Sequence, residues 1–222
     1  MSEPSPNPIL SLPDVHTAFA AFQDDPLVQA VTAYVKEYMK RYDASHSWDH
    51  VERVVAMAHH IYEHSPHELK NKADLRTVHL AALVHDVGDH KYRKPEEPLL
   101  PLSELLPQIT SPIPFPADLA QKLQTIIPAI SYTHETRHPS QTLSLIIQHP
   151  ELAIVQDADR LDAMGAVGIG RMFTYGDARG NSDGKGRSLA ETMKHLDEKL
   201  LKLEGMMKTD VGKEVARVRG RG

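Results

Sequence analysis

The sequence predicts an all-α fold, and three observations lead to this expectation. Apolar residues recur at helical spacing in most segments, as Leu27, Val31, Val35 and Tyr38 do within 26–42. No run of alternating β-branched residues indicates a strand, and the chain has no internal repeat. The 222 residues are enough for one domain with a sizeable buried core.

The predicted helices follow one another along most of the chain. In order, they span about residues 26–42, 48–64, 72–87, 117–131, 140–148, 151–175, 188–207 and 211–219. Pro26 suits the first turn of the first helix, and Gly88 is a suitable stop after the third. The segments 132–138 and 176–186 are polar or Gly-rich and are expected to be loops.

The remaining segments set the domain organisation. We expect a flexible N-terminal segment at 1–24, one helical bundle domain at 25–215 and a frayed basic tail at 216–222. Residues 94–116 are rich in proline, which excludes a long helix there. This Pro-rich insert is expected to be a surface loop, with a lid over a site as the alternative.

Composition and charge exclude several classes of function. The formal net charge is -5 at pH 7, so binding of a nucleic-acid polymer through overall charge is not expected. The chain has no Cys, which excludes disulfides, thiolate catalysis and Cys-based zinc sites. Because the first residues lack a secretory pattern and no apolar run could span a bilayer, we expect a cytoplasmic protein, with the nucleus as a second compartment, and no membrane partner.

Histidine and aspartate residues on three predicted helices indicate a metal site. His85 and Asp86 are adjacent at the end of the apolar run 78–84, and His50 lies in the helix before them. Asp159 lies on a helix far downstream, and distant helices of a bundle can point into one cavity. Imidazole and carboxylate together suit a divalent metal ion. The alternative, a simple helix end, explains His85 but not Asp86, because an aspartate is unfavourable beside a helix C-terminus.

Three long blocks of sequence carry a family resemblance. They read SHSWDHVERV at 45–54, AALVHDVGDHK at 81–91 and VQDADRLDAMGAVGIGR at 155–171. With these blocks, roughly residues 25–215 resemble the HD superfamily of metal-dependent phosphohydrolases. They are most similar to its small single-domain branch, whose characterised bacterial members are nucleoside triphosphate pyrophosphohydrolases. The resemblance implies an all-α HD-domain helical bundle, here with a Pro-rich insert.

The resemblance also implies a ligand set for one ion of Mn, Mg, Co, Ni or Fe. The set comprises His50, His85, Asp86 and one downstream aspartate, which the family places in an Ala-Asp-(Arg)-Leu context that maps to Asp159. Asp157 is the alternative, two residues away on another side of the helix. With Asp159 as the ligand, Asp157 and Asp162 become capping groups or groups that orient the histidines or Arg160.

Residues beside the expected ligands are candidates for catalysis and substrate binding. Lys91 and Arg93 follow the dyad and could hold phosphate oxygens. His46 and Asp49 precede His50, and either could donate a proton or contact phosphate. We therefore expect Asp86, His46 and Lys91 to be catalytic, and His46, Asp49, Lys91 and Arg93 to bind substrate. A solvated turn remains the alternative for Arg93.

Other positions have structural interpretations. Arg53 lies one helical turn from Asp49, so a surface ion pair between them is expected. Gly165, Gly168 and Gly170 are expected to allow close helix packing. Two histidines of the segment 132–138, His134 and His138, are expected to be exposed loop residues, with contact to phosphate or a second metal as the alternative. An apolar face at 196–207 is expected to pack on the core, or on a second subunit of a homodimer.

The resemblance implies metal-assisted hydrolysis of a nucleoside triphosphate to monophosphate and pyrophosphate. The expected partner is accordingly a nucleotide or another phosphorylated small molecule, bound by a monomer or homodimer. A nucleotidase or cyclic-nucleotide phosphodiesterase could use the same ion, and a di-iron oxygenase would need further ligands. A non-catalytic metal and nucleotide sensor is the alternative outside the enzymes.

Overall fold

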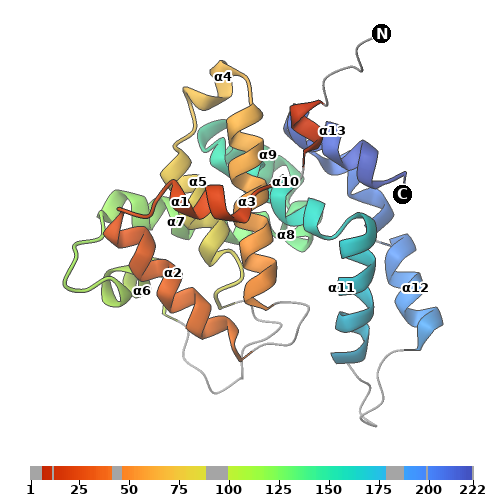
Figure 1. Ribbon diagram of the computed structural model, residues 1–222, viewed down its shortest axis with the longest axis horizontal. Coiled ribbons are helices and arrows are strands. Elements are labelled where there is room, and N and C mark those ends of the chain that lie inside the picture. The colour runs from red at the N-terminus through yellow and green to blue at the C-terminus, as the bar shows by residue number, and fades with distance from the viewer. Residues whose placement is uncertain are drawn as a thin grey trace.

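The computed structural model describes residues 7–11, 13–41, 47–88, 100–178, 188–198 and 200–221, and all regular structure in these ranges is helical (Figure 1). The α-helices are α1 Val15–Ala20, α2 Pro26–Met39, α3 Trp48–His64, α4 His67–Lys70, α5 Leu75–Val84, α6 Leu102–Ile109, α7 Ala117–Ile130, α8 Tyr132–Arg137, α9 Pro139–Gln148, α10 Glu151–Asp162, α11 Gly165–Ala178, α12 Leu189–Glu198 and α13 Asp210–Arg219. The 3-10 helices are η1 Pro8–Leu10, η2 Leu200–Lys202 and η3 Glu204–Met206. The predicted all-α fold is confirmed.

Three helices, α3, α5 and α10, form the centre of the bundle (Figure 1). In α3, Val51, Val54, Ala58 and Ile61 recur at helical spacing and are fully buried. Burying a side chain such as Ile61 contributes roughly 1.5–3 kcal/mol relative to exposure. The apolar face of α3 thus fixes the face of the helix that points into the bundle.

Helix α5 begins and ends at residues whose chemistry explains its limits. Its N-cap Asp74 accepts a hydrogen bond from the Thr77 backbone N–H at 2.8 Å, which satisfies one of the free donors at the helix start. Its apolar run is buried throughout, as Leu80 and Leu83 show. Four residues after the helix ends, Gly88 adopts φ 78, a backbone conformation that favours glycine.

The chain turns between α10 and α11, where the sequence predicted one helix over 151–175. Gly165 has φ 66, and a Cβ at Gly168 would lie 2.1 Å from the Ala163 carbonyl oxygen. The two glycines therefore allow the first turn of α11 to lie directly against the end of α10. Gly170 has open space around it, so the expected packing role does not apply there.

Two further expectations differ from the structure. In the Pro-rich insert, α6 forms at 102–109, because Leu102 and Leu106 share a face that is buried against the bundle. The first part of the insert, to residue 99, lies outside the described residues. The polar segment 132–138, expected as a loop, contains the short helix α8, capped by the Ser131 side chain.

Described parts of the expected flexible N-terminal segment and of the expected basic tail are helical. Within 1–24, α1 packs on α3 and buries Ala18 completely. At the other end, α13 extends into the expected frayed tail, and Arg219 donates a hydrogen bond to the Leu161 carbonyl at 2.6 Å. The expected helix 188–207 is divided into α12, η2 and η3. Among the described residues, no helix is both long and apolar enough to cross a membrane.

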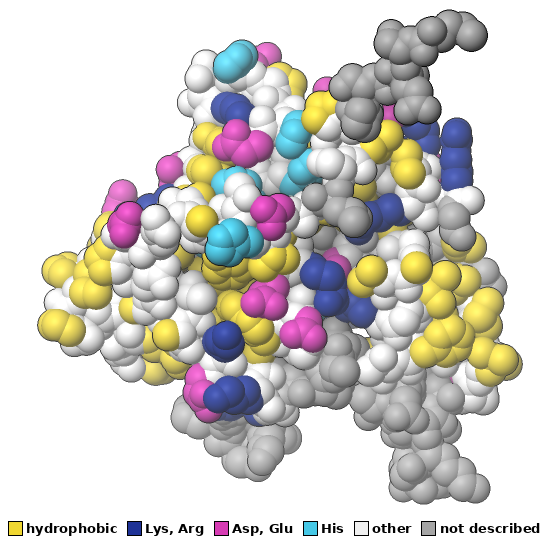
Figure 2. Space-filling model, viewed as in Figure 1, with side chains coloured by type: hydrophobic (Ala, Val, Ile, Leu, Met, Phe, Trp, Pro, Cys, Tyr) yellow, Lys and Arg dark blue, Asp and Glu magenta, His cyan; other side chains and the backbone are white. Residues whose placement is uncertain are grey.

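The pair of helices α11 and α12 stands beside the bundle and presents apolar side chains outward (Figures 1 and 2). Its large apolar residues that are more than two-fifths exposed are Val167, Ile169, Phe173, Leu189 and Met193. The hairpin therefore leaves several large apolar side chains uncovered, as α9 does at Leu143 and Ile147.

Candidate metal centre

The four predicted metal ligands lie together where α3, α5 and α10 meet. His50 is in the first turn of α3 and is 1% exposed, while His85 and Asp86 directly follow the last residue of α5. Asp159 is on α10, one turn before the end of the helix. His85 is buried as well, whereas the side chains of Asp86 and Asp159 are 16% and 32% exposed. The carboxylate side of the cluster is thus the side open to solvent.

The ligand atoms of His50, His85 and Asp86 all lie within 4.8 Å of one another, and Asp159 lies near the two histidines. The Nε2 atoms of His50 and His85 are 3.2 Å apart. Asp86 Oδ2 lies 3.4 Å from His50 Nε2 and 3.5 Å from His85 Nε2. Asp159 Oδ1 lies 3.5 and 3.8 Å from the same two nitrogens. Ligand atoms about 2.1 Å from one ion, at tetrahedral or octahedral angles, are about 3.0–3.5 Å from their neighbours, so the spacing suits a single small cation.

Hydrogen bonds at the far side of each ring support the same interpretation. His50 Nδ1 donates to Asp162 Oδ2 at 2.7 Å, and His85 Nδ1 donates to the Ala82 carbonyl at 2.8 Å. Because ionised carboxylates and carbonyls only accept, both Nδ1 atoms carry the proton. In the neutral rings, the two Nε2 lone pairs then face each other and two carboxylates, an arrangement that a cation stabilises.

Asp162 joins His50 to two arginines. Arg53 on α3 donates to both carboxylate oxygens, from Nε at 2.7 Å and from Nη2 at 3.0 Å. Arg171 on α11 places Nη1 3.1 Å from Oδ2. Burial raises the pKa of Asp162, but hydrogen bonds from His50 and Arg53 outweigh burial and hold the pKa well below its ordinary value. Asp162 is therefore an anion that orients the His50 ring.

The same surroundings act on His50. Burial and the positive charge of Arg171 lower the pKa of His50, but the hydrogen bonds with Asp162 and Asp86 outweigh them and raise the pKa above its ordinary value. A cation at the converging Nε2 atoms would compete with the proton for the same lone pair.

The alternative aspartate, Asp157, points away from this cluster. Its carboxylate is buried and accepts from the backbone N–H groups of Lys208 at 2.9 Å and Thr209 at 2.7 Å, and from the Thr209 hydroxyl at 2.7 Å. A Cβ at Gly212 would lie 2.4 Å from Asp157 Oδ2, so the start of α13 fits closely over this carboxylate. Burial raises the pKa of Asp157 in spite of these donors. Asp157 therefore holds the start of α13.

The structure describes only part of the expected catalytic and substrate-binding set. Asp49 is exposed in the first turn of α3, beside His50. His46, Lys91 and Arg93 lie outside the described residues. The surface pair expected between Arg53 and Asp49 is replaced by the bidentate contact of Arg53 with Asp162.

Sequence reasoning missed two groups of interacting residues. One is the contact of Asp162 with Arg53 and Arg171, although Asp159 and Asp162 are three residues apart and so share a helix face. The other lies under α8, where Glu135 accepts from the buried Arg160 and from Lys208 Nζ, the latter at 2.7 Å. No local pattern indicates that second group, because its members are distant in sequence.

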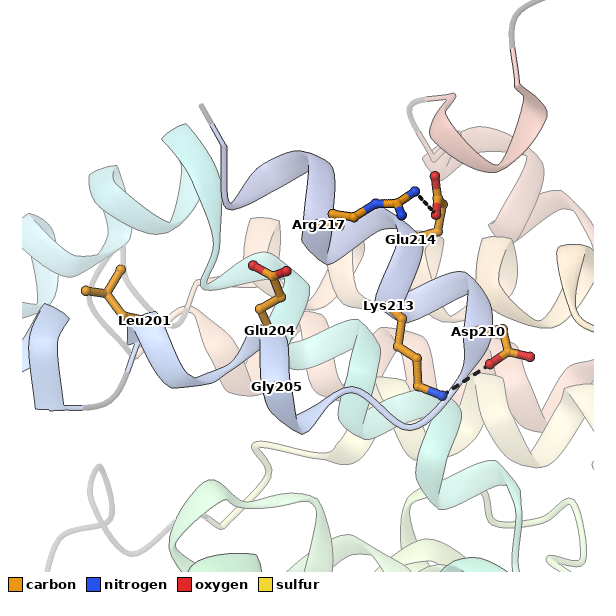
Figure 3. Close-up of a pocket in the computed structure, with 7 residues that line it drawn as sticks. All are labelled: Leu201, Glu204, Gly205, Asp210, Lys213, Glu214 and Arg217. Atoms are coloured by element: carbon orange, nitrogen blue, oxygen red, sulfur yellow. Dashed lines mark hydrogen bonds and ion pairs between the residues drawn. The ribbon is translucent and has the colours of Figure 1, made fainter.

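A surface groove lies apart from the candidate metal centre (Figure 3). It runs between the 3-10 helices and α13, and its lining residues are Leu201, Glu204, Gly205, Asp210, Lys213, Glu214 and Arg217. Its charges pair within the groove, Lys213 with Asp210 at 3.2 Å and Arg217 with Glu214. None of the candidate ligands lines it.

Comparison with known proteins identifies the class of protein that this bundle and cluster define. Residues 47–164, more than half of the chain, match the HD domain. The chain belongs to the HD-domain superfamily and is an HD-type metal-dependent phosphohydrolase. The predicted family and enzyme class are both confirmed.

Individual relatives cover most of the chain. The protein YpgQ of Bacillus subtilis is 35% identical over 191 residues, which is 86% of this chain and 85% of YpgQ. A crystal structure of YpgQ in complex with ADP matches with a TM-score of 0.63 at 32% identity, over 88% of each chain. An HD-superfamily hydrolase from Bacillus thuringiensis matches with a TM-score of 0.58 at 27% identity, over 87% of this chain and 89% of the other.

Proposed function

We propose that this phosphohydrolase cleaves a nucleoside triphosphate to the monophosphate and pyrophosphate, at one divalent ion held by His50, His85, Asp86 and Asp159. The observation that carries the proposal is the grouping of His50, His85 and Asp86, whose ligand atoms all lie within 4.8 Å of one another. Asp159 Oδ1 lies 3.5 and 3.8 Å from the two histidine nitrogens and is the proposed fourth ligand. Two neutral imidazoles and two carboxylates balance a 2+ charge. The N and O donors suit Mn²⁺, Mg²⁺, Co²⁺, Ni²⁺ or Fe²⁺.

The chain's own residues prepare the site for this reaction. When bound, a divalent ion lowers the pKa of a coordinated water and neutralises charge on phosphate. Asp162 and the Ala82 carbonyl hold the two rings with Nε2 toward the cluster. The partial exposure of Asp86 and Asp159 leaves room for water and substrate on that side. Lys91 and Arg93 are proposed to hold phosphate oxygens, and His46 and Asp49 to donate a proton or bind phosphate.

A nucleotide is the proposed substrate because of a relative. YpgQ, 35% identical to this chain, has been crystallised in complex with ADP. The conclusion that the same ligand class binds here rests on that similarity together with the family resemblance. Cleavage between the α and β phosphates rests on the resemblance alone, so the product must be measured.

A product assay on metal-free protein tests the proposal. Protein stripped with a chelator receives Mn²⁺, Mg²⁺, Co²⁺ or Ni²⁺ singly, with a panel of nucleoside triphosphates, deoxynucleoside triphosphates, monophosphates and cyclic nucleotides. Pyrophosphate and orthophosphate are measured separately. We expect metal-dependent release of pyrophosphate, absent from the metal-free protein and from the double variant His85→Ala/Asp86→Ala.

The matched control is His67→Ala, which removes an exposed histidine of α4 and is expected to leave activity unchanged. Orthophosphate release would replace the proposed reaction with that of a phosphatase or nucleotidase, and cleavage of cyclic nucleotides alone would replace it with that of a phosphodiesterase. Tight nucleotide binding without turnover would contradict the proposal in favour of a sensor.

A further inference from the structure

An ion pair of Arg171 links the α11–α12 hairpin to the HD centre. Arg171 is in the second turn of α11, and its Nη1 lies 3.1 Å from Asp162 Oδ2. The same oxygen accepts from His50 Nδ1 at 2.7 Å. The side chains are 15%, 5% and 1% exposed for Arg171, Asp162 and His50, so water screens these contacts little. The line of contacts thus runs from α11 to the ring whose Nε2 faces the candidate metal ligands.

The backbone around Arg171 gives this contact a fixed geometry. A Cβ at Gly168 would lie 2.1 Å from the Ala163 carbonyl oxygen, so the first turn of α11 touches the residue that follows Asp162. At the Gly165 turn, a Cβ would lie 3.5 Å from the Arg219 carbonyl oxygen, which places α13 against the same turn. Arg171 is therefore presented to Asp162 from a helix that is held on two sides near its start.

The buried carboxylate of Asp162 is compensated by two arginines, Arg53 and Arg171. The Asp162 side chain is only 5% exposed, and a buried charged group requires charged or hydrogen-bonding partners. Arg53 contributes one charge, but its side chain is 36% exposed and is partly screened by water. The more buried Arg171 supplies positive charge to Oδ2, the oxygen that accepts from His50. The two arginines thus fix the position of the oxygen that accepts from His50 Nδ1, and this hydrogen bond turns Nε2 of the ring toward the candidate ligands.

We propose that Arg171 is a positioning residue of the metal centre, which acts through Asp162 to hold the His50 ring in the orientation and tautomer that bind the ion. This inference rests on the proposed metal ligands but not on the proposed substrate. Outer groups that orient a ligating histidine commonly contribute 10- to 100-fold to metal affinity.

Mn²⁺ binding tests the inference without reference to activity. Free Mn²⁺ is measured by electron paramagnetic resonance during titration of chelator-stripped full-length protein. Arg171→Gln removes the charge and keeps a polar side chain, and we expect it to weaken Mn²⁺ binding about 10-fold or more. Arg171→Lys keeps the charge and is expected to bind within about threefold of wild type. Arg217→Gln, which removes a half-exposed arginine of α13, is the matched control and should bind like wild type.

The pattern of affinities separates positioning from packing. A purely structural role for Arg171 would lower the unfolding temperature of both variants and would not separate Gln from Lys in Mn²⁺ affinity. Wild-type affinity in folded Arg171→Gln, or equal weakening in Arg171→Gln and Arg171→Lys, would overturn the inference. If Arg171→Gln does not fold, Arg171→Met is the second neutral variant, and the same comparison with Arg171→Lys decides.

The outcome can be distinguished from a failure of the proposed reaction. If wild-type protein binds Mn²⁺ but cleaves no nucleotide, the proposed reaction is contradicted. The role of Arg171 is then still decided by the Mn²⁺ affinities of its variants. Wild-type protein that binds no Mn²⁺ overturns both the ligand set and the inference.

Discussion

The two histidines of the candidate centre meet at their Nε2 atoms but are held in different ways. His85 Nδ1 donates to the Ala82 carbonyl of its own helix, three residues earlier. His50 Nδ1 donates to Asp162, 112 residues away, which is itself held by Arg53 on α3 and Arg171 on α11. Half of the centre is therefore built by local helix geometry, and the other half depends on how distant helices pack. The two halves should respond differently to substitution.

The largest expected effect separates two aspartates of α10. Asp159→Asn removes a proposed ligand charge and should weaken Mn²⁺ binding more than about 100-fold with little loss of stability. Asp157→Asn replaces the acceptor at the start of α13, and it should lower the free energy of unfolding by about 1–3 kcal/mol and leave the Mn²⁺ stoichiometry unchanged. Mn²⁺ titration and urea unfolding measure the two effects. If Asp157→Asn also lost the ion, the assignment of the fourth ligand would be wrong.

The next effect tests the difference between the two histidines directly. Asp162→Asn places an amide NH₂ group, itself a donor, among the N–H groups of His50, Arg53 and Arg171, which need an acceptor. Mn²⁺ affinity should therefore fall about 10- to 100-fold, and the free energy of unfolding should fall by about 3–5 kcal/mol. Ala82→Gly keeps the carbonyl that holds His85, and should cost only about 1 kcal/mol of stability, with Mn²⁺ affinity preserved. Equal losses of affinity in the two variants would remove the distinction between a local and a distant support.

Sequence alone predicts the ligand positions better than the contacts that hold them. The apolar run before His85 fixes the end of α5, and the spacing of Val51, Val54 and Ala58 fixes the face of α3, so the positions of His85 and His50 follow from helix period. The sequence also offered Asp162 as a group that could orient the histidines, but its contact with Arg171 depends on the turn at Gly165, which periodicity does not indicate. Arg53 had an acceptable local partner in Asp49, and only packing shows that Asp162 replaces it.

A third histidine, His79, is also buried, but unlike His50 it forms no hydrogen bond to a carboxylate among the described residues. It packs edge-on to Phe19 at 5.4 Å, and its Nε2 has no hydrogen-bond partner among the described residues. Burial lowers the pKa of His79 to about 4. In the unfolded chain the pKa of His79 is near 6.5, so between pH 4 and 6.5 the unfolded state binds more protons than the folded state. The contribution of His79 to the free energy of unfolding is therefore complete above about pH 6.5 and is lost as the pH falls toward 4.

The measurement is urea unfolding of wild type and His79→Phe at pH 7 and pH 5. The wild type should lose about 2 kcal/mol more than the variant between these values, because the phenyl ring fills the site without titrating. An identical pH dependence of the two proteins would show that His79 is not the neutral buried ring that the geometry indicates.

The smallest expected effect concerns the fork of Arg53. Arg53→Lys keeps the charge beside Asp162 but replaces two directed hydrogen bonds with one point charge. Because the site is partly exposed, we expect Mn²⁺ affinity to fall less than about 10-fold, and to fall less than in Arg171→Gln. A larger loss in Arg53→Lys would move the main support of Asp162 from α11 to α3.

The sequence predicts the fold class and the long helices better than it predicts helix ends and short helices. The helix at 48–64 matches α3, because its apolar period is uninterrupted and Pro66 lies just beyond it. The short helices α6 and α8 were not predicted. Helix α6 has an apolar face only two turns long, and the neighbouring prolines argue against a helix there. Helix α8 is polar, and its Glu135 forms ion pairs with Arg160 and Lys208. Such contacts arise from tertiary packing and leave no local pattern.

The most direct test of the account is the position of a bound Mn²⁺ ion in crystals of this protein, located by anomalous scattering. The account predicts one strong peak about 2 Å from Nε2 of His50 and of His85 and from a carboxylate oxygen of Asp86 and of Asp159. A peak at any other group of residues, or no peak at this point in crystals saturated with Mn²⁺, would contradict the proposed centre.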